Sequence, residues 1–328
     1  MKPLRSLKQS IGVLALIALS AIAEAKDTGR IFVSNEQSHA VTVLDGQTYA
    51  QVATIKTGRR PRDLKFSTDK TRLYVACGDD NRIDIIDVTR LAVVDSIRGV
   101  DDPEVFDLGP GDRQLFVSNE DAGTLSIIDL VTKKIIRSIK VGQEPEGVLV
   151  TPDGTTVFVA SEAASLVQAI DVASGTIKAN VAVGSRPRRF AQSKDGKEIW
   201  VSAEVDGAVY VLDGLHYTVT SRIEFKLKGF RREDIKPVGL TLTRDGTTAF
   251  VTLGHANRIA IVDAGTKEVR DYILVGKRPW GVTLSHDDAR LFVTNGASDD
   301  ITIVDTRANR VIRSVPVGRT PHSVVIDD

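Results

Sequence analysis

Residues 115–152 read LFVSNEDAGTLSIIDLVTKKIIRSIKVGQEPEGVLVTP, and this stretch decides the fold. It contains four short segments, LFVSNE, TLSIID, IIRSIKV and GVLVTP, in which apolar and polar residues alternate and β-branched residues are common. Turns rich in Gly, Asp, Asn and Pro separate them at intervals of about ten residues, so the pattern predicts four consecutive β-strands. No part of this unit shows helical periodicity.

The unit recurs seven times along the chain, and three features mark each copy. An aromatic residue, followed by valine, stands at Phe32, Tyr74, Phe116, Phe158, Trp200, Phe250 and Phe292, spaced by 42 residues except for one gap of 50. An aspartate lies 13 residues after each aromatic: Asp45, Asp87, Asp129, Asp171, Asp213, Asp263 and Asp305. A proline precedes the last segment of each unit: Pro61, Pro103, Pro145, Pro187, Pro237, Pro279 and Pro321.

The length of the repeat predicts the architecture. Four strands in roughly 40–45 residues are typical of a propeller blade. We therefore predict an all-β, seven-bladed β-propeller with four antiparallel strands per blade. The segments 30–56 and 322–326 each supply part of a unit, so the N- and C-terminal strands should share one blade and close the ring.

The first 25 residues differ in character from the repeats. Lys2, Arg5 and Lys8 precede the apolar run 11–23, which ends in Ala-Glu-Ala. A membrane-spanning helix needs roughly 20 apolar residues, so this shorter run predicts a secretory signal peptide over 1–25. We expect a single propeller domain over 26–328, exported to the periplasm, with no membrane span.

Composition excludes several classes of protein. The chain has 43 basic and 43 acidic side chains, so it is not a strongly charged protein that finds its partner through net charge. Its one cysteine, Cys77, excludes an internal disulfide framework, a CxxC redox site and c-type haem attachment, and we expect it to be buried and inert.

The segments FVSN, YVAC and FVTN, followed by IIDL or IVDT and then by VGxxP, resemble the YVTN family of β-propeller repeat proteins. The resemblance covers essentially the whole chain after residue 25, and its form is similar to the propeller group associated with PQQ-dependent alcohol catabolism. The resemblance implies an exported seven-bladed propeller that acts near periplasmic quinoprotein dehydrogenases, with no settled activity of its own.

Residues that recur in every blade build the fold, whereas residues that occur once are candidates for function. The aspartates suit tight turns, where a carboxylate accepts backbone N–H groups. The aromatics suit packing between blades, and the prolines fix a turn before the innermost strand. None of these three sets of repeated residues predicts a catalytic or ligand-binding role.

The loops around the prolines are the most variable part of each unit and should surround one mouth of the central channel. Their basic side chains form an arc that we expect to bind a small anionic ligand or a periplasmic protein partner, or else to form ion pairs on the rim. This arc comprises Arg59, Arg60, Arg62, Arg186, Arg188, Arg189, Lys236, Lys277, Arg278, Arg319 and His322. Two neighbouring loops form an acidic notch in the arc: Asp101, Asp102, Glu104, Glu144 and Glu146.

The one insertion, residues 226–233 (KLKGFRRE), lengthens a loop on this face. It is either neutral variation or a basic loop with an apolar tip, carrying Phe230, Arg231 and Arg232. We expect Phe230 to lie next to Trp280, the one tryptophan outside the repeated aromatic column. Trp and Arg are residue types that anchor interfaces, so these residues are candidates for binding a ligand or partner.

Catalytic patterns are weak. The sequence has no GxSxG, HExxH, P-loop or Rossmann glycine motif, and no two of its five histidines have metal-ligand spacing. We therefore name no catalytic residue, metal ligand or cofactor.

The hypothesis we favour is a monomeric, non-catalytic binding or scaffold propeller that is accessory to a periplasmic, PQQ-dependent system. The first alternative is a lactonase-like propeller hydrolase, which needs carboxylates facing the channel and a metal. The second is single-stranded nucleic-acid binding by arginines interleaved with Phe230 and Trp280. The zero net charge argues against nucleic acid as the main partner.

Overall fold

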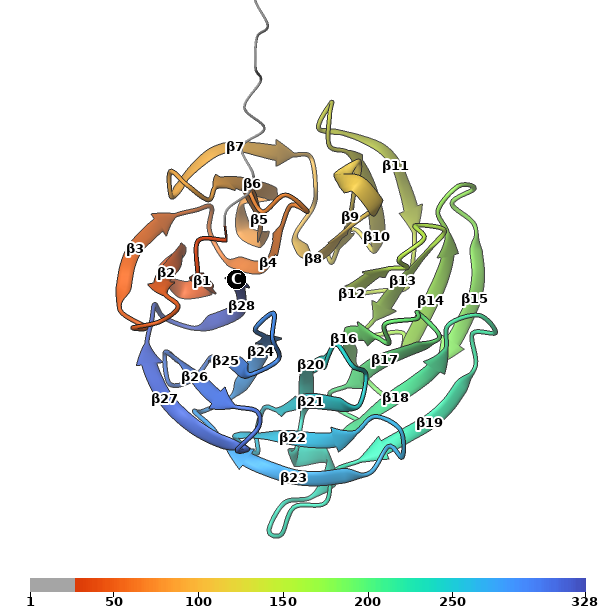
Figure 1. Cartoon of the computed structure of the whole chain (residues 1–328). Helices are drawn as coiled ribbons and strands as arrows, with labels where there is room; N and C mark the ends of the chain where they lie inside the picture. The colour runs from red at the N-terminus through yellow and green to blue at the C-terminus, as the bar shows by residue number, and fades with distance from the viewer. Residues whose placement is uncertain (1–26) are drawn as a thin grey trace, which may run out of the picture.

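The seven repeats fold into seven four-stranded antiparallel sheets around a central channel (Figure 1). This computed structural model describes residues 27–328, so the predicted signal peptide lies outside the described residues. Within the described range no helix is long and apolar enough to cross a membrane. The prediction of a seven-bladed propeller is confirmed.

We number the blades in chain order. Blade 1 contains β28 (Pro321–Asp327), β1 (Arg30–Asn35), β2 (Ala40–Asp45) and β3 (Gln51–Lys56). Blade 2 contains β4 (Pro61–Phe66), β5 (Arg72–Cys77), β6 (Arg82–Asp87) and β7 (Ala92–Arg98). Blade 3 contains β8 (Pro103–Leu108), β9 (Gln114–Asn119), β10 (Thr124–Asp129) and β11 (Lys134–Lys140).

Blade 4 contains β12 (Pro145–Val150), β13 (Thr156–Ser161), β14 (Leu166–Asp171) and β15 (Ile177–Ala182). Blade 5 contains β16 (Pro187–Gln192), β17 (Glu198–Ala203), β18 (Ala208–Asp213) and β19 (Val219–Glu224). Blade 6 contains β20 (Pro237–Leu242), β21 (Thr248–Leu253), β22 (Arg258–Asp263) and β23 (Val269–Leu274). Blade 7 contains β24 (Pro279–Leu284), β25 (Arg290–Asn295), β26 (Asp300–Asp305) and β27 (Arg310–Pro316). Four short 3-10 turns lie at η1 (Glu36–Ser38), η2 (Gly78–Asp80), η3 (Pro110–Asp112) and η4 (Arg232–Asp234).

The ring closes in blade 1. Strand β28 pairs antiparallel with β1, with Arg30 opposite Asp327 and Phe32 opposite Val325. The backbone N–H of Gly29 also donates to the carbonyl of Asp327 at 2.7 Å. The two ends of the chain therefore complete one sheet, as predicted, and β28 covers the edge of β1 that would otherwise stay open.

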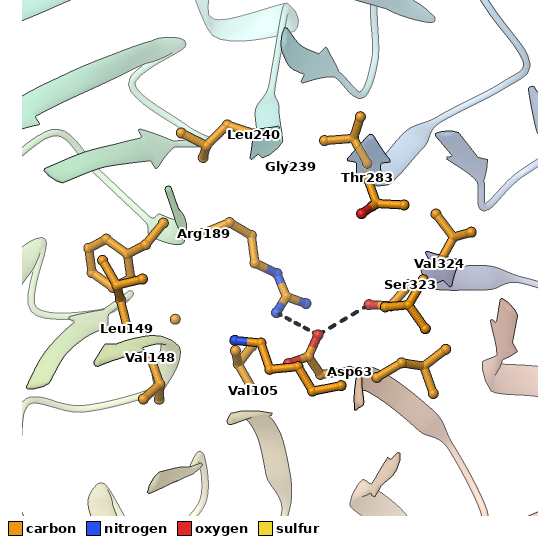
Figure 2. Close-up of a pocket in the computed structure, with 17 residues that line it drawn as sticks. Asp63, Val105, Val148, Leu149, Arg189, Gly239, Leu240, Thr283, Ser323 and Val324 are labelled. Atoms are coloured by element: carbon orange, nitrogen blue, oxygen red, sulfur yellow. Dashed lines mark hydrogen bonds and ion pairs between the residues drawn. The ribbon is translucent and has the colours of Figure 1, made fainter. Parts of the chain in front are cut away.

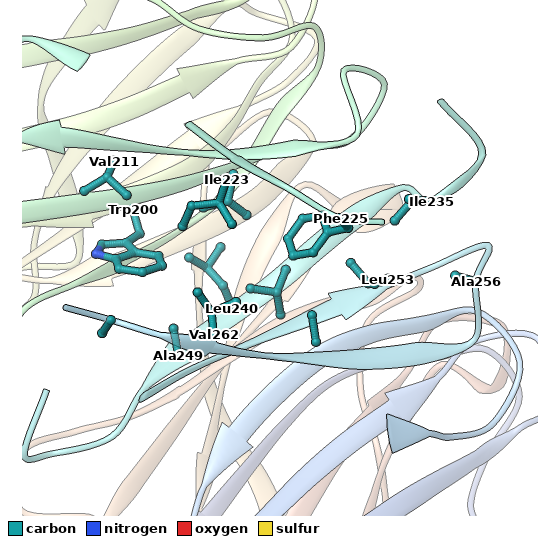
Figure 3. Packing of buried hydrophobic residues seen from close by; sticks show 14 residues of the cluster. Trp200, Val211, Ile223, Phe225, Ile235, Leu240, Ala249, Leu253, Ala256 and Val262 are labelled. Atoms are coloured by element: carbon teal, nitrogen blue, oxygen red, sulfur yellow. The ribbon is translucent and has the colours of Figure 1, made fainter. Parts of the chain in front are cut away.

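The core lies between neighbouring blades rather than in one central mass. All seven repeated aromatics are buried, and burial of each contributes about 1.5–3 kcal/mol. Figure 3 shows one such layer, in which Trp200 and Val211 of blade 5 pack with Leu240 and Val262 of blade 6. Cys77 is also fully buried, and burial raises the pKa of its thiol, as expected of an inert cysteine.

The repeated aspartates end the third strand of the sheet and organise the turn that follows. Asp45 accepts the backbone N–H groups of Gln47 at 3.1 Å and Thr48 at 2.7 Å. Carboxylates at the other six positions of the column accept turn N–H groups in the same way. The predicted structural role is therefore confirmed.

Each repeated proline begins an innermost strand, so the seven strands that line the channel all start at the same mouth. The residue before each proline adopts a left-handed backbone conformation, with φ between 43° at Asp102 and 61° at Arg186. This turn sets the direction in which the chain enters the channel. Loops between the second and third strands of each sheet reach the same mouth, since they contact these turns.

Candidate functional site

Two rings of side chains surround the channel mouth. The inner ring consists of the residue after each strand-starting proline: Arg62, Glu104, Glu146, Arg188, Val238, Trp280 and His322. The outer ring consists of the residue four positions after each repeated aromatic: Glu36, Gly78, Glu120, Glu162, Glu204, Gly254 and Gly296. Blades 1 to 7 therefore contribute the pairs His322/Glu36, Arg62/Gly78, Glu104/Glu120, Glu146/Glu162, Arg188/Glu204, Val238/Gly254 and Trp280/Gly296.

Hydroxyl groups from the neighbouring blade hold the backbone of the inner ring. The side chain of Ser202 donates to the carbonyl of Val238 at 2.6 Å, and Thr252 donates to the carbonyl of Trp280 at 2.9 Å. Thr294 does the same for His322 at 2.8 Å. These residues stand two positions after the repeated aromatic. The strand that carries the buried aromatic therefore also holds the backbone of the inner ring at the channel mouth.

Arg188 is the centre of a buried cluster in blades 4 and 5. Its guanidinium contacts the carboxylates of Glu146 and Glu162, and its Nε lies 3.2 Å from Glu204 Oε2. The Arg188 side chain is 6% exposed and the three glutamates are no more exposed than that. Fork-shaped donors suit this arrangement, in which one guanidinium serves three acceptors.

Glu146 and Glu162 hold one proton between them. Burial, the hydrogen bond to Glu146 and its charge raise the pKa of Glu162 to about 9. Burial opposes ionisation of Glu146 too, but Arg188 and the hydrogen bond from Glu162 hold its pKa well below the usual range. Near neutral pH the pair is therefore one carboxylate and one carboxylic acid.

A second cluster lies in blades 2 and 3. Arg62 Nη1 lies 2.7 Å from Glu104 Oε2, and Arg62 Nε lies 3.4 Å from Glu36 Oε1. Arg60 contacts both Glu104, at 3.0 Å, and Asp102. Burial, followed by repulsion from Glu104, raises the pKa of the adjacent Glu120 to about 7. Glu120 is therefore a partly buried carboxyl group with a pKa near neutrality, a property shared by many acid–base groups.

Blades 6 and 7 present a different half of the mouth. Glycine replaces glutamate at Gly254 and Gly296, and the inner ring offers Val238 and Trp280 instead of charges. A cavity of about 280 Å³ opens beside Trp280 and Gly296 of blade 7, where this blade meets blade 1. Its lining comprises Glu36, Arg62, Arg188, Arg278, Trp280, Gly296, Thr320, Pro321 and His322.

Trp280 organises this mouth cavity. The guanidinium carbons of Arg188 and Arg278 lie 4.8 and 4.9 Å from its ring centre, and the ring of His322 lies 5.5 Å away. Burial, reinforced by the charges of Arg62 and Arg189, lowers the pKa of His322 well below its ordinary value, so the imidazole is neutral at pH 7. The cavity thus has an aromatic wall and a neutral imidazole, and both lie beside the buried ion pairs of Arg62 and Arg188.

Arg189 crosses the channel below the mouth and faces Asp63 on the opposite wall (Figure 2). Its Nη1 lies 3.9 Å from Asp63 Oδ1, and its Nη2 lies 3.2 Å from His322 Nε2. Beneath the two side chains is a second cavity of about 210 Å³ whose walls are mainly apolar, including Leu149 and Leu240. Arg189 therefore separates the mouth cavity from the lower channel.

One group of carboxylates has the spacing that a metal ion requires. Ligand atoms of Asp102, Glu104 and Glu120 lie within 4.8 Å of one another. Oxygen ligands of this kind suit a hard divalent cation. Arg60 already contacts two of the three, so a metal ion would have to compete with its guanidinium.

The structure brings part of the predicted site together. Arg60, Arg62, Arg188 and Arg189 converge with Glu104, Glu146, Asp102 and His322 at the mouth, and Arg278 and Trp280 join them. Arg186 pairs with Glu162 at 2.5 Å. The remaining loop residues of the arc and the notch lie on the rim: Arg59, Lys236, Lys277, Arg319, Asp101 and Glu144.

The insertion does not meet Trp280. Its loop projects from the outer edge of the ring between β19 and β20 (Figure 1). Phe230 is 37% exposed and lies under the guanidinium of Arg258, at 5.7 Å. Arg231 is exposed, and Arg232 lies 3.7 Å from Glu224. The arginine and aromatic stripe required by the nucleic-acid alternative is therefore not assembled from Phe230 and Trp280.

The sequence prediction missed the outer ring. Glu36, Glu162 and Glu204 pair with arginines of the predicted basic arc, so much of that arc is internally neutralised. The repeated aromatic positions would have been enough to find this ring, since the fourth residue after each aromatic is glutamate or glycine. Gly296, which lines the mouth cavity, and Gly254 belong to the same column.

Comparison with known proteins agrees with this architecture. Residues 6–328 match the family described as YNCE-like beta-propeller. No curated protein matches the sequence.

Several solved structures share the fold. Hydrazine synthase from Kuenenia stuttgartiensis is 21% identical, with a TM-score of 0.77, over 85% of this chain and 93% of that one. The periplasmic gluconolactonase PpgL from Pseudomonas aeruginosa is 20% identical, with a TM-score of 0.76, over 91% and 99% of the two chains. The dihydro-heme d1 dehydrogenase NirN is 16% identical, with a TM-score of 0.70, over 92% and 76%. At these identities the similarity establishes the fold alone.

Proposed function

The chain belongs to the YNCE-like β-propeller family, and we propose that it is a binding protein that takes a small ligand in the mouth cavity at blades 7 and 1. One observation carries the proposal. In the two rings, charged side chains fill the positions of blades 3, 4 and 5, whereas blades 6 and 7 have Val238, Gly254, Trp280 and Gly296 there. The cavity lies where the pattern of the repeat is broken.

Gly296 supports this interpretation because its backbone does not require glycine. A Cβ atom at this position would have its nearest neighbours at 3.6 and 3.7 Å, which is ordinary contact, and its φ is not left-handed. The equivalent positions of blades 4 and 5 carry glutamates that reach Arg188. The lack of a side chain at Gly296 therefore leaves space beside Trp280 without serving the turn.

The ligand would be held by polar groups at the edges of an aromatic wall, which is the usual composition of a small-molecule site. A cavity of about 280 Å³ lies just below the range of about 300–1,000 Å³ typical of drug-sized ligands, so a small molecule suits it.

We extend the proposal to the setting of the protein. The apolar run 11–23 after a basic start and the YVTN-like repeats support export to the periplasm, as an accessory of a PQQ-dependent alcohol-catabolism system. A partner protein could bind the rim residues around the cavity. PQQ is a polycarboxylate, so it belongs among the ligands to be tested.

A hydrolase similar to lactonases is a second candidate, and one observation favours it. The carboxyl group of Glu120, with its pKa raised to about 7 by burial, lies beside Asp102 and Glu104 at metal-ligand spacing. A divalent cation held by Asp102 and Glu104 would supply a Lewis acid for activating water, and Glu120 would then be placed as the base. Metal analysis of the purified protein tests this candidate, because a hydrolase of this kind should hold about one equivalent of a divalent ion.

The binding proposal is tested by thermal unfolding with a panel of compounds: PQQ, D-gluconate, D-glucono-1,5-lactone, benzoate and choline. At about 100 times its Kd a ligand adds about 2.7 kcal/mol of stability, so at least one compound should raise the Tm by several degrees. The same compound should have no effect on Gly296→Glu, which adds the side chain found in blades 4 and 5. Gly296→Ala is the matched control and should keep the response. An equal response in wild type and Gly296→Glu, or no response to any compound, would contradict the proposal.

A further inference from the structure

Arg278 differs from the other two arginines that line the mouth cavity, Arg62 and Arg188. Arg60, Arg62, Arg186 and Arg188 each have a carboxylate oxygen within 3.1 Å. Among residues 27–328, the carboxylate paired with Arg278 is Glu204, with 4.0 Å between Nη2 and Oε1. The Arg278 side chain is 42% exposed, and its Nη1 lies 3.0 Å from His255 Nε2. One guanidinium of the mouth cavity is therefore available to an incoming anion.

The position of Arg278 is fixed although its charge is weakly satisfied. Its guanidinium carbon lies 4.9 Å from the ring centre of Trp280, and its backbone N–H donates to Asn257 Oδ1 at 2.9 Å. Stacking on an aromatic ring leaves the in-plane N–H donors of a guanidinium directed outward, where they can bind a carboxylate through two hydrogen bonds.

The indole of Trp280 gives the cavity an aromatic wall. Within the described part of the chain its Nε1 is buried and has no hydrogen-bond partner, so a ligand in the cavity would contact the ring and not this N–H group.

The opposite wall of the cavity offers an acceptor. Glu36 Oε1 lies 3.4 Å from Arg62 Nε and 3.9 Å from His322 Nε2, and these long contacts leave oxygen lone pairs of Glu36 available. A hydroxyl group can donate to such an oxygen. The cavity therefore has an anion-binding group, an aromatic wall and an acceptor around one small volume.

From these contacts we infer that the ligand is a small hydroxylated monocarboxylate, with its carboxylate on Arg278 and a hydroxyl group donating to Glu36. The inference rests on the proposed function and names its ligand class. A dianion fits less well, because the remaining arginines of the cavity are already paired with buried glutamates.

Isothermal titration with three probes tests the class. D-gluconate carries both groups, D-glucose has hydroxyl groups without a carboxylate, and hexanoate has a carboxylate without hydroxyl groups. We expect D-gluconate to bind the wild type roughly tenfold or more tightly than either of the others, since a hydrogen bond to a charged group is worth about 1.5–3 kcal/mol.

Two variants test whether the probes bind to Arg278 and inside the mouth cavity. Arg278→Gln should lower the affinity for D-gluconate to about that for D-glucose and leave D-glucose unchanged within about twofold, because only the charge-assisted contact is lost. Gly296→Glu should abolish binding of all three probes, since its side chain would occupy the cavity. Circular dichroism and the Tm of each variant show whether it is folded.

Equal affinities for hexanoate and D-gluconate would overturn the hydroxyl requirement, and equal affinities for D-glucose and D-gluconate would overturn the carboxylate requirement. If D-gluconate does not bind the wild type, the ligand class is wrong. The proposed site would still stand in that case if another compound of the thermal panel stabilises the wild type but not Gly296→Glu, so the two failures are distinguishable.

Discussion

Blades 4 and 5 and blades 6 and 7 are built from the same repeat, yet their ends at the channel mouth differ. In blades 4 and 5, Glu146, Glu162, Arg188 and Glu204 form a buried ionic cluster. In blades 6 and 7 the same two columns carry valine, tryptophan and two glycines, and a cavity remains. One half of the mouth is closed by internal ion pairs, and the other half is open to a ligand.

The difference shows how a repeat protein can separate stability from binding. Charges in the closed half are neutralised by neighbours in the next blade, so they contribute little to any external field. Arg278 and Trp280 in the open half have partly unused hydrogen-bonding groups. A count of arginines at the mouth therefore overstates its attraction for anions, and their partners decide which of them can bind.

The largest effect on the free energy of unfolding is expected from removing the arginine at the centre of the closed half. Arg188→Ala leaves the buried Glu146 and Glu204 without their guanidinium, and loss of one partner of a buried ion pair costs about 3–5 kcal/mol. Urea unfolding followed by circular dichroism measures this loss. Arg278→Ala is the matched control in the open half, with an expected cost of about 1 kcal/mol or less because Arg278 is exposed and only loosely paired. Similar losses for both variants would show that the two halves do not differ.

A smaller effect is expected in the pH dependence of stability. The pKa of Glu162 is raised to about 9 by burial, the hydrogen bond to Glu146 and its charge, from an ordinary value of 4.5. The folded protein then retains a proton that the unfolded chain releases, so this contribution to stability is complete below about pH 4.5 and is lost as the pH rises toward about 9. Glu162→Gln is neutral at every pH and keeps a donor for Glu146.

Urea unfolding at about pH 6 and about pH 9 measures the difference. The free energy of unfolding should fall more between these two values in the wild type than in Glu162→Gln. An equal fall in both proteins would mean that the pair does not share a proton.

The smallest effect is expected outside both halves, at the insertion. Phe230 lies under the guanidinium of Arg258 in the loop between β19 and β20 and is not part of the lining of the mouth cavity. Phe230→Ala should change the free energy of unfolding by about 0.5 kcal/mol or less and leave the response to any stabilising compound unchanged. Loss of the response in this variant would place the ligand site at the insertion instead.

The sequence predicts the propeller because the features that build it recur in every copy. Phe32 or Asp45 has an equivalent in each blade, so a periodic search finds both, and the closure of β28 on β1 follows from counting periods. The prolines also place the variable loops at a common mouth. The basic arc, the acidic notch and Trp280 could therefore be assigned to one face.

The pairing within that face could not be predicted in the same way. Glu162 reaches Arg188 across a blade boundary, at a separation of 26 residues, and the direction of both side chains depends on the tertiary arrangement. The position of Phe230 depends on the path of an insertion that has no equivalent in the other blades. Such contacts are set by three-dimensional geometry and not by the period of the repeat.

The access of small solutes to the mouth cavity beside Trp280 can be measured directly by tryptophan fluorescence. Trp200→Phe places the residue found at most aromatic positions of the repeat in the core and leaves Trp280 as the one tryptophan. In this background we predict that acrylamide quenches the fluorescence of Trp280 and that Gly296→Glu lowers the quenching constant by about half or more, because small solutes reach a cavity only while it is unfilled. Gly296→Ala should leave the constant nearly unchanged. Equal quenching in all three proteins would contradict the account, since Gly296 would then not control access to the indole.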